Sequence, residues 1–204
     1  ERNVEVSSFD EIRISGGWEV PLVPGEAYDL QINVQAHLLD HIKVSINGNT
    51  LEVGTEGKVS TNERMKIRIS APEIAGIHLS GASVLRTERL LAASRLDLEC
   101  SGASELYREV ECDQITLDVS GASEAYLEGS ARQLNVGASG AAKFYGSSCQ
   151  TESAEAYASG ASYAEVYATS SLRAEASGAS KIVYSGNPDQ VTESSSGASS
   201  VRAK

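Results

Sequence analysis

The sequence predicts an all-β protein, a single-stranded parallel β-helix with coils of about 19 residues. Three observations lead to this fold class. The quartet Ser-Gly-Ala-Ser returns every 18 to 21 residues, apolar and polar residues alternate before each copy, and no helical pattern occurs inside the repeat. Leucine-rich, ankyrin and tetratricopeptide repeats need a helix or a longer period, so one β-coil per period remains.

The quartet occurs seven times, and only the fourth copy departs from the pattern, ending in Ala142 instead of serine. The first serines of the copies are Ser80, Ser101, Ser120, Ser139, Ser159, Ser177 and Ser196. Glycine reaches backbone angles closed to other residues, and serine and alanine are small, so the quartet is typical of a sharp corner between closely stacked coils. We expect the serine hydroxyls to satisfy backbone groups of that corner.

Apolar residues form columns on both sides of the quartet. They stand five, three and one residues before the first serine in most coils, as in Leu96, Leu98 and Cys100. Another column, five residues after that serine, contains Leu85, Leu106, Ala125, Phe144, Ala164, Ile182 and Val201. Period-two alternation turns one face of each strand inward. Two strands per coil should therefore enclose one core through residues 76–204.

Residues 1–75 are more divergent and should form an N-terminal cap of the same single domain, residues 1–204. Within this cap, Ser15-Gly16-Gly17-Trp18 lies between alternating apolar positions and predicts a divergent first coil. Asn47-Gly48-Asn49 predicts a hairpin turn between two strands. A short helix is expected around residues 36–42.

The composition excludes several partners. With 28 acidic and 17 basic residues, the net charge of −11 argues against nucleic acid and anionic lipid surfaces. No run of about 18 apolar residues occurs, so no membrane-spanning segment is expected. The chain begins at Glu1 without methionine, which fits an export signal removed earlier. Cys100, Cys112 and Cys149 are odd in number and lack Cys-x-x-Cys spacing, so they indicate packing residues or free thiols and neither a metal site nor disulfides.

An enzymatic role has two possible sites in this sequence. A serine nucleophile needs a histidine base, and His78, two residues before Ser80, has no evident third group to orient it. Asp97, Glu99 and Asp118 share an outward face on adjacent coils, which would suit calcium or carboxylate catalysis on a polysaccharide. Acidic side chains on a solvated face are ordinary, however. We expect no catalytic residue, metal or cofactor.

A tyrosine column is the feature that most favours binding. Tyr107, Tyr126 and Tyr145 each stand six residues after the first serine of their repeat, between inward positions. They should form an outward ladder on three consecutive coils. Exposed aromatic rings in a row could contact a glycan or a protein, although tyrosines also stabilise neighbouring strands by stacking on each other.

Tandem Ser-Gly-Ala-Ser coils, preceded by the stretch from Phe9 to Trp18 with its Ile-Ser-Gly-Gly, resemble the autotransporter adhesin head domain family. This family is common among exported proteins of Bacteroidetes, and the resemblance covers nearly the whole chain. It implies a pectin-lyase-like, right-handed parallel β-helix in the cell envelope or outside the cell. It supplies no catalytic motif that could be carried over residue by residue.

We therefore expect a non-catalytic surface or envelope protein whose outer face binds a host or cell-surface glycan or protein. Two alternatives stay open: a polysaccharide-active β-helix enzyme with an acidic cluster, and a structural scaffold of the envelope. A β-helix end exposes unpaired strand edges. A homodimer through the coil at Val201 is therefore conceivable.

Overall fold

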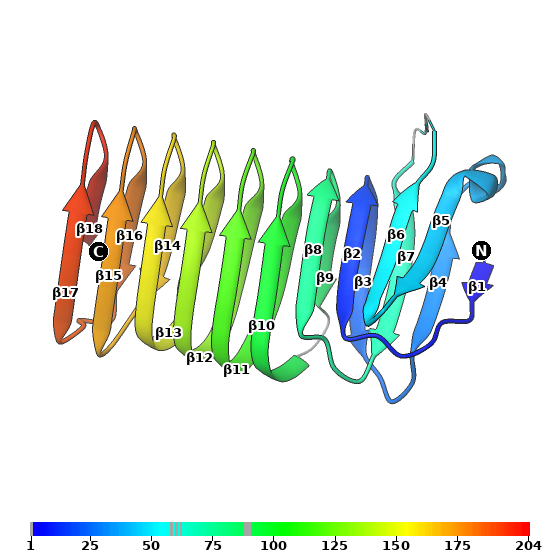
Figure 1. Ribbon diagram of the computed structural model, residues 1–204, viewed down its shortest axis with the longest axis horizontal. Coiled ribbons are helices and arrows are strands. Elements are labelled where there is room, and N and C mark those ends of the chain that lie inside the picture. The colour runs from blue at the N-terminus through cyan, green and yellow to red at the C-terminus, as the bar shows by residue number, and fades with distance from the viewer. Residues whose placement is uncertain (1, 58, 60, 62, 88–90) are drawn as a thin grey trace.

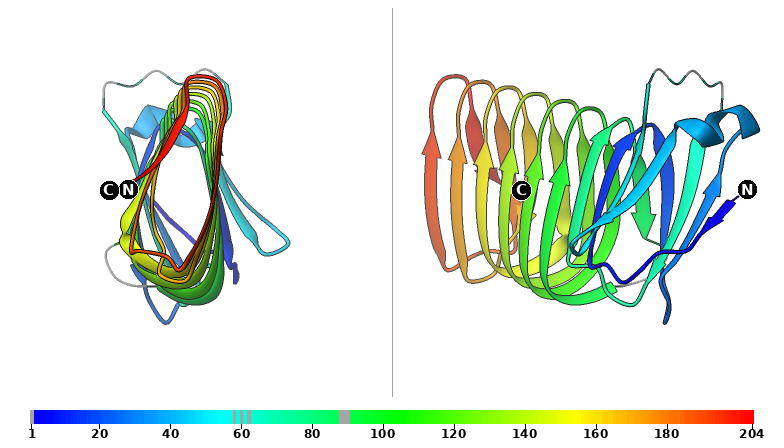
Figure 2. Two further views of the ribbon diagram at one scale, coloured as in Figure 1. Left: turned by 90° about the vertical axis from the view of Figure 1, so that its left-hand side faces the viewer. Right: turned by 45° about the vertical axis from the view of Figure 1, so that its right-hand side comes forward.

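The computed structural model, which describes residues 2–57, 59, 61, 63–87 and 91–204, is a β-solenoid of stacked parallel strands (Figure 1). Strands one coil apart are separated by about 19 residues, as in the pairs Leu117 with Val136 and Ile182 with Val201. The predicted parallel β-helix is confirmed. Seen along its axis, the solenoid is a flattened oval with one narrow and one rounded corner (Figure 2).

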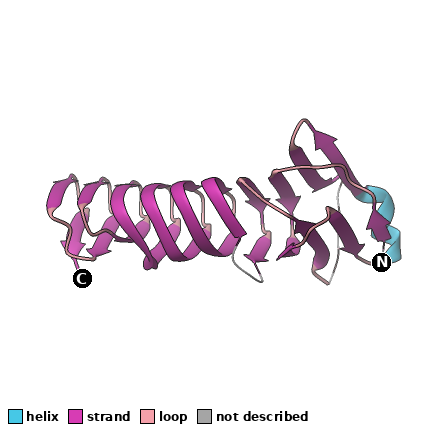
Figure 3. Cartoon of the chain, turned by 90° about the horizontal axis from the view of Figure 1, so that it is seen from below, coloured by secondary structure: helices cyan, strands magenta, loops and turns pink. Residues whose placement is uncertain are grey.

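Strands make up almost all of the regular structure, and the one helix among the described residues lies near the N-terminus (Figure 3). The N-terminal elements are β1 (Arg2–Val4), β2 (Glu11–Gly16), β3 (Trp18–Pro24), β4 (Asp29–Asn33), the 3₁₀ helix η1 (Ala36–His41), β5 (Ile42–Asn47), β6 (Thr50–Thr55) and β7 (Met65–Ala71). The repeats form β8 (Gly76–Gly81), β9 (Val84–Thr87), β10 (Leu91–Cys100), β11 (Glu105–Val119), β12 (Glu124–Ala138), β13 (Lys143–Ala158), β14 (Tyr163–Tyr167), β15 (Ser171–Ala176), β16 (Lys181–Ser185), β17 (Gln190–Ser195) and β18 (Ser200–Ala203).

The quartets occupy the narrow corner and divide each coil into two strands, so the solenoid has two broad faces (Figures 1 and 2). The face that we call entering contains the strands that lead into the quartets: β8, β10, β15, β17 and the C-terminal halves of β11, β12 and β13. The leaving face contains β9, β14, β16, β18 and the N-terminal halves of those three long strands. Residues on the two faces point to opposite sides of the molecule.

The coils are not stacked in the order of the chain. The coil of β2 and β3, with Ser15-Gly16-Gly17-Trp18 at its corner, lies between the coil of β6 and β7 and the coil of β8 and β9. All four of these pairings are parallel. The predicted divergent coil is thus first along the chain but second along the axis, because the chain returns to place β6 and β7 outside it (Figure 1).

Antiparallel strands complete the N-terminal end. Strand β4 pairs with both β1 and β7, and β5 forms a hairpin with β6. The predicted hairpin turn is confirmed, with Gly48 at a φ of 62°. The short helix expected around residues 36–42 is present as η1, whose only buried residue is Leu38.

Glycine is required in the quartets for two reasons. The seven quartet glycines have φ angles between 71° and 78°, a region that residues with a Cβ seldom adopt. They also stack directly on one another, so a Cβ at Gly121 would lie 2.6 Å from the carbonyl oxygen of Gly102. The next amide uses this closeness, because Ala122 N donates to that same carbonyl at 2.7 Å.

The fourth residue of the quartet points inward in most coils. The hydroxyls of Ser83, Ser162 and Ser180 donate to backbone carbonyls, whereas that of Ser104 donates to the Ser123 hydroxyl. Ser83, Ser104, Ser123, Ser162 and Ser180 are buried. The Ser180 hydroxyl donates to the carbonyls of Ser177, at 2.8 Å, and of Ala158, in the preceding coil, at 2.9 Å. Buried hydroxyls need such partners. The predicted structural role of these serines is confirmed.

The core is continuous from the cap to the later coils, as the apolar columns predict. One column contains Ile12, Leu51, Ile77, Leu98, Leu117, Val136, Ala156 and Ala174, all buried. The three cysteines are free thiols, as expected. Burial raises the pKa of both Cys100 and Cys149 to about 12.

Candidate functional site

The predicted tyrosine ladder is present on the leaving face. Tyr107 pairs in register with Tyr126, and Tyr126 with Tyr145. The rings of the first pair are stacked with centroids 4.5 Å apart and planes within 3°, and those of the second are 4.7 Å apart at 14°. These separations match the spacing of adjacent strands. We call these three residues the tyrosine strip.

The two end rings of the strip, Tyr107 and Tyr145, also have a neighbour on their outer side. The Arg86 guanidinium lies 3.6 Å from the centroid of Tyr107, a cation–π contact. Tyr163 packs against Tyr145 at 5.8 Å with a tilt of 53°. The strip therefore presents ring edges to solvent, and a sugar cannot stack on the face of Tyr126 in this arrangement.

Neither of the side chains at the ends of the strip, Arg86 and Tyr163, was predicted from the sequence. Tyr163 stands four residues after its first serine and pairs with Lys143, so it falls outside the column of the strip. Arg86 stands in the column, in register with Tyr107, but its sequence position gives no sign that its side chain covers a ring. Residues offset by two positions can still meet on one face of a sheet, because side chains lean along the strand.

Carboxylates fix two of the strip's three hydroxyl groups. Tyr107 donates to Glu105 at 3.0 Å, and Tyr126 donates to Glu124, which also accepts a hydrogen bond from Lys143 Nζ at 2.7 Å. Lys143 and the Tyr126 hydroxyl lower the pKa of Glu124, whereas its carboxylate raises the pKa of Tyr126. The strip is thus ordered before any partner arrives.

The three predicted carboxylates lie on the entering face, as expected. Glu99 pairs in register with Asp118, and Asp97 stands two residues earlier on the same strand as Glu99. Burial, then Glu99 and Asp97, raises the pKa of Asp118. Among the residues that the structure describes, no group of three or more histidine, cysteine or acidic side chains is placed to hold a metal ion.

His78 has a partner that sequence reasoning overlooked. Its Nδ1 lies 3.1 Å from Glu99 Oε2, so the expectation that no group orients this histidine was wrong. The hydroxyls of Ser80 and Ser101 donate to the backbone carbonyls of Ile14 and Leu79. These quartet serines serve the corner instead of a catalytic pair.

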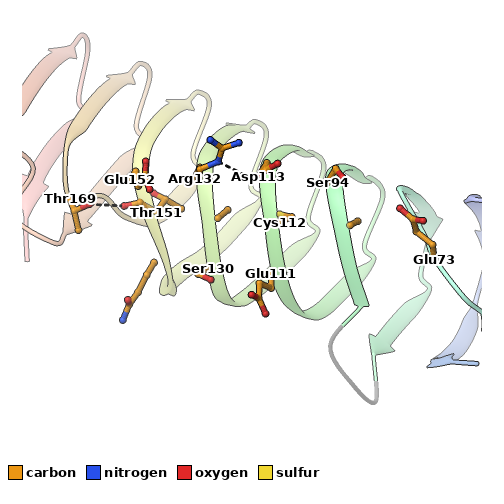
Figure 4. A pocket seen from close by; sticks show the side chains of 13 residues that line it. Glu73, Ser94, Glu111, Cys112, Asp113, Ser130, Arg132, Thr151, Glu152 and Thr169 are labelled. Carbon is orange, nitrogen blue, oxygen red and sulfur yellow. Dashed lines mark hydrogen bonds and ion pairs between the residues drawn. The ribbon is translucent and has the colours of Figure 1, made fainter.

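A hollow of about 810 Å³ lies at the rounded corner, where β11, β12 and β13 bend (Figure 4). Arg132 Nε on its rim donates to Asp113 at 2.9 Å, and the Thr151 hydroxyl on its floor donates to Tyr167 O. These polar groups are already satisfied. The floor is otherwise a column of small side chains: Ala93, Cys112 and Ala131. We assign it no ligand.

The model of the family described as "Putative auto-transporter adhesin, head GIN domain" matches residues 8–188, which include both faces and the tyrosine strip. The chain belongs to this family. Its membership confirms the resemblance seen in the quartets and in the stretch from Phe9 to Trp18. No curated protein matches the chain by sequence.

Solved structures share the family's fold. A "putative adhesin" from Bacteroides fragilis superposes with a TM-score of 0.93 at 23% identity, covering 100% of this chain and 95% of that one. A "putative lipid binding protein" from Parabacteroides distasonis gives 0.75 at 19% identity, and a "putative adhesin" from Parabacteroides merdae gives 0.77 at 16%, each with the same coverage. At these identities the likeness establishes the fold and not a common ligand. In the described part of the chain, no helix is long and apolar enough to cross a membrane.

Proposed function

We propose that this protein is a non-catalytic adhesion module of the cell envelope or the extracellular space. It contacts a host or cell-surface glycan or protein through the leaving face of its solenoid. The tyrosine strip, residues Tyr107, Tyr126 and Tyr145, is the contact surface. Family membership supports a role in adhesion, and the net charge of −11 argues against nucleic acid as the partner.

The observation that carries this proposal is the rigid order of the strip. Its rings are half-exposed and stacked on three consecutive coils, and the hydroxyls of Tyr107 and Tyr126 are tied to Glu105 and Glu124. Tyrosine is enriched at interfaces because it offers a large contact area at low cost in conformational entropy. A surface that is already ordered loses less entropy on binding. The covered ring faces favour contact through ring edges and through the carboxylates.

The experiment is retention of the purified protein on a panel of immobilised glycans and matrix proteins. Replacing all three strip tyrosines by alanine should weaken retention on the surfaces that bind the wild type by roughly tenfold or more, since tyrosine anchors commonly contribute over about 1 kcal/mol each. A triple phenylalanine variant keeps the stacked rings and separates their effect from that of the hydroxyls.

A matched control changes the same three coils on the opposite face, with Gln114→Ala, Gln133→Ala and Ser153→Ala. Circular dichroism establishes that each variant is folded. Unchanged retention of a folded strip variant refutes the role of the strip. Failure of the wild type to bind any surface favours the envelope scaffold. A calcium-dependent rise in Tm that Glu99→Gln removes favours the polysaccharide-active enzyme.

The homodimer through the last coil stays a prediction. Strands β17 and β18 each pair in register with one strand of the preceding coil, and Val191 is 42% exposed. Sedimentation analysis of the wild type and Val191→Lys tests it, because lysine would oppose burial of that edge.

A further inference from the structure

The entering face contains a gap in one of its outward columns. This column runs through His78, Glu99, Asp118, Gly137, Tyr157, Glu175 and Ser194. Gly137 is the only member without a side chain, and it does not adopt a left-handed φ. Strand geometry therefore does not require glycine there. The strands of Asp118 and Tyr157, on either side of Gly137, are two strand spacings or roughly 9.6 Å apart.

One wall of this gap is an aromatic ring. Tyr157 donates its hydroxyl to Glu155, two residues earlier, at 2.8 Å, just as Tyr107 donates to Glu105 in the strip. The strip's rings, held in this way, turn their faces toward the neighbouring coils. The same anchor in Tyr157 favours a ring face turned toward Gly137, with which Tyr157 borders one hollow. No described aromatic residue stacks on it.

The other wall is a carboxylate. A Cβ built on Gly137 would lie 2.5 Å from Asp118 Oδ1, so this carboxylate leans into the gap over the glycine backbone, and a ligand ring there would turn this flexible side chain aside. On the far side of Tyr157, Arg173 donates to Glu175 at 2.6 and 2.9 Å. One wall of the gap can accept hydrogen bonds, and the other offers an apolar ring face.

Serine hydroxyls form the rim. The hollow of about 340 Å³ at this point is also bordered by Ser139, Ser159 and Ser177, first serines of their quartets. The equivalent hydroxyls of Ser80 and Ser101 donate to backbone carbonyls. Those of the three rim serines have no hydrogen-bond partner in the part of the chain described. They are available to a ligand.

We propose that this gap, which we call the Gly137 slot, binds the ring of a neutral hexopyranose. The strip shows that rings in adjacent coils sit 4.5 to 4.7 Å apart, so a sugar ring above Gly137 would stack on Tyr157 at a similar distance. The Asp118 carboxylate would then accept hydrogen bonds from the sugar's hydroxyl groups, and the rim hydroxyls would donate or accept them. The hollow continues along the corner from Ser120 to Ser196, so a single ring at Gly137 would fill only part of it.

Charge selects among sugars. The carboxylates of Asp118 and, one coil away, Glu99 repel an anionic uronic or sialic acid, and none of the described residues that border the slot is a lysine or arginine. Burial, and after it the charges of Glu99 and Asp97, raise the pKa of Asp118. The slot lies on the face opposite the tyrosine strip, so this proposal does not depend on the strip.

The test is a titration of the ¹⁵N-labelled protein with the methyl glycosides of glucose, galactose and mannose, up to tens of millimolar, followed by amide chemical shifts. At least one glycoside should shift the Gly137 and Tyr157 amides. Tyr157→Ala should weaken its binding roughly tenfold, whereas Tyr157→Phe should stay within about twofold, because the ring face and not the hydroxyl makes the contact.

Gly137→Tyr places a protein ring in the slot and should abolish the shifts. Asn135→Tyr, two residues earlier on the same face, is the matched control and should leave binding unchanged. The proposal is overturned if no glycoside shifts these amides in the wild type, or if folded Gly137→Tyr binds as the wild type does. Tighter binding of N-acetylneuraminic acid, or of a planar aromatic cation, would also overturn it.

Discussion

Gly121→Ala tests the glycine column of the narrow corner. Gly121 has a φ of 71°, where alanine costs about 1–2 kcal/mol. The new Cβ would also lie 2.6 Å from Gly102 O and 3.1 Å from Gly102 N, and backbone cannot move aside as a flexible side chain can. Overpacking of this kind costs about 1–3 kcal/mol, and stretching the bond from Ala122 to Gly102 costs about 1 more.

The sum is at least about 3 kcal/mol of destabilisation, which corresponds to a fall in Tm of roughly 6–12 °C for a chain of this size. Gly48→Ala is the matched control, since Gly48 has a φ of 62° but no neighbouring atom within 4 Å of a built Cβ. It should show only the conformational cost, about 1–2 kcal/mol. Thermal melting by circular dichroism measures both variants. Equal falls in Tm would refute the reasoning, because backbone strain alone would then explain the glycine at the corner.

Three further predictions concern single side chains. Ala142→Ser supplies the buried hydroxyl that the fourth quartet lacks and should stabilise the protein by about 0.5–1.5 kcal/mol in chemical denaturation; a loss of stability would show that this corner has no room for it. At pH 8 a thiol reagent should modify half-buried Cys112 first, because Cys100 and Cys149 are buried with pKa values near 12; equal rates would contradict that burial. Burial and then the charges of Glu99 and Asp97 raise the pKa of Asp118, so ionised Asp118 destabilises the folded protein once the pH exceeds the pKa of the unfolded state; Asp118→Asn should raise Tm at pH 7 and not at pH 3, and a fall at pH 7 would contradict this cost of ionisation.

The repeat made most of the fold predictable from sequence. Glycine, small residues and alternating apolar columns recur at one period, so local signals and the global stack agree at each coil. The hairpin at Gly48 was equally clear, because its turn residues are specific. The stacking order of the N-terminal coils was not predictable, since nothing in Ser15-Gly16-Gly17-Trp18 shows that β6 and β7 pack outside the coil of β2 and β3.

The candidate sites were predictable in position and not in detail. The column of Tyr107, Tyr126 and Tyr145 follows from counting residues, and so does the pairing of Glu99 with Asp118. The position of a residue in the repeat does not determine which way its side chain leans along the strand. The ring contacts at the ends of the strip and the pairing of His78 with Glu99 depend on rotamers, which the period of a strand does not fix.

The central claim is that the quartets stabilise the solenoid, whereas the outward side chains of its columns bind the glycan or protein partner. Retention on immobilised glycans and matrix proteins tests it most directly when a quartet variant and the strip variant are compared at one temperature where both are folded. Ser104→Ala with Ser123→Ala, both buried, should lower Tm and leave retention at the wild-type level. The triple alanine variant of the tyrosine strip should lose retention. The opposite result, in which the serine variant loses retention and the strip variant keeps it, would contradict the account.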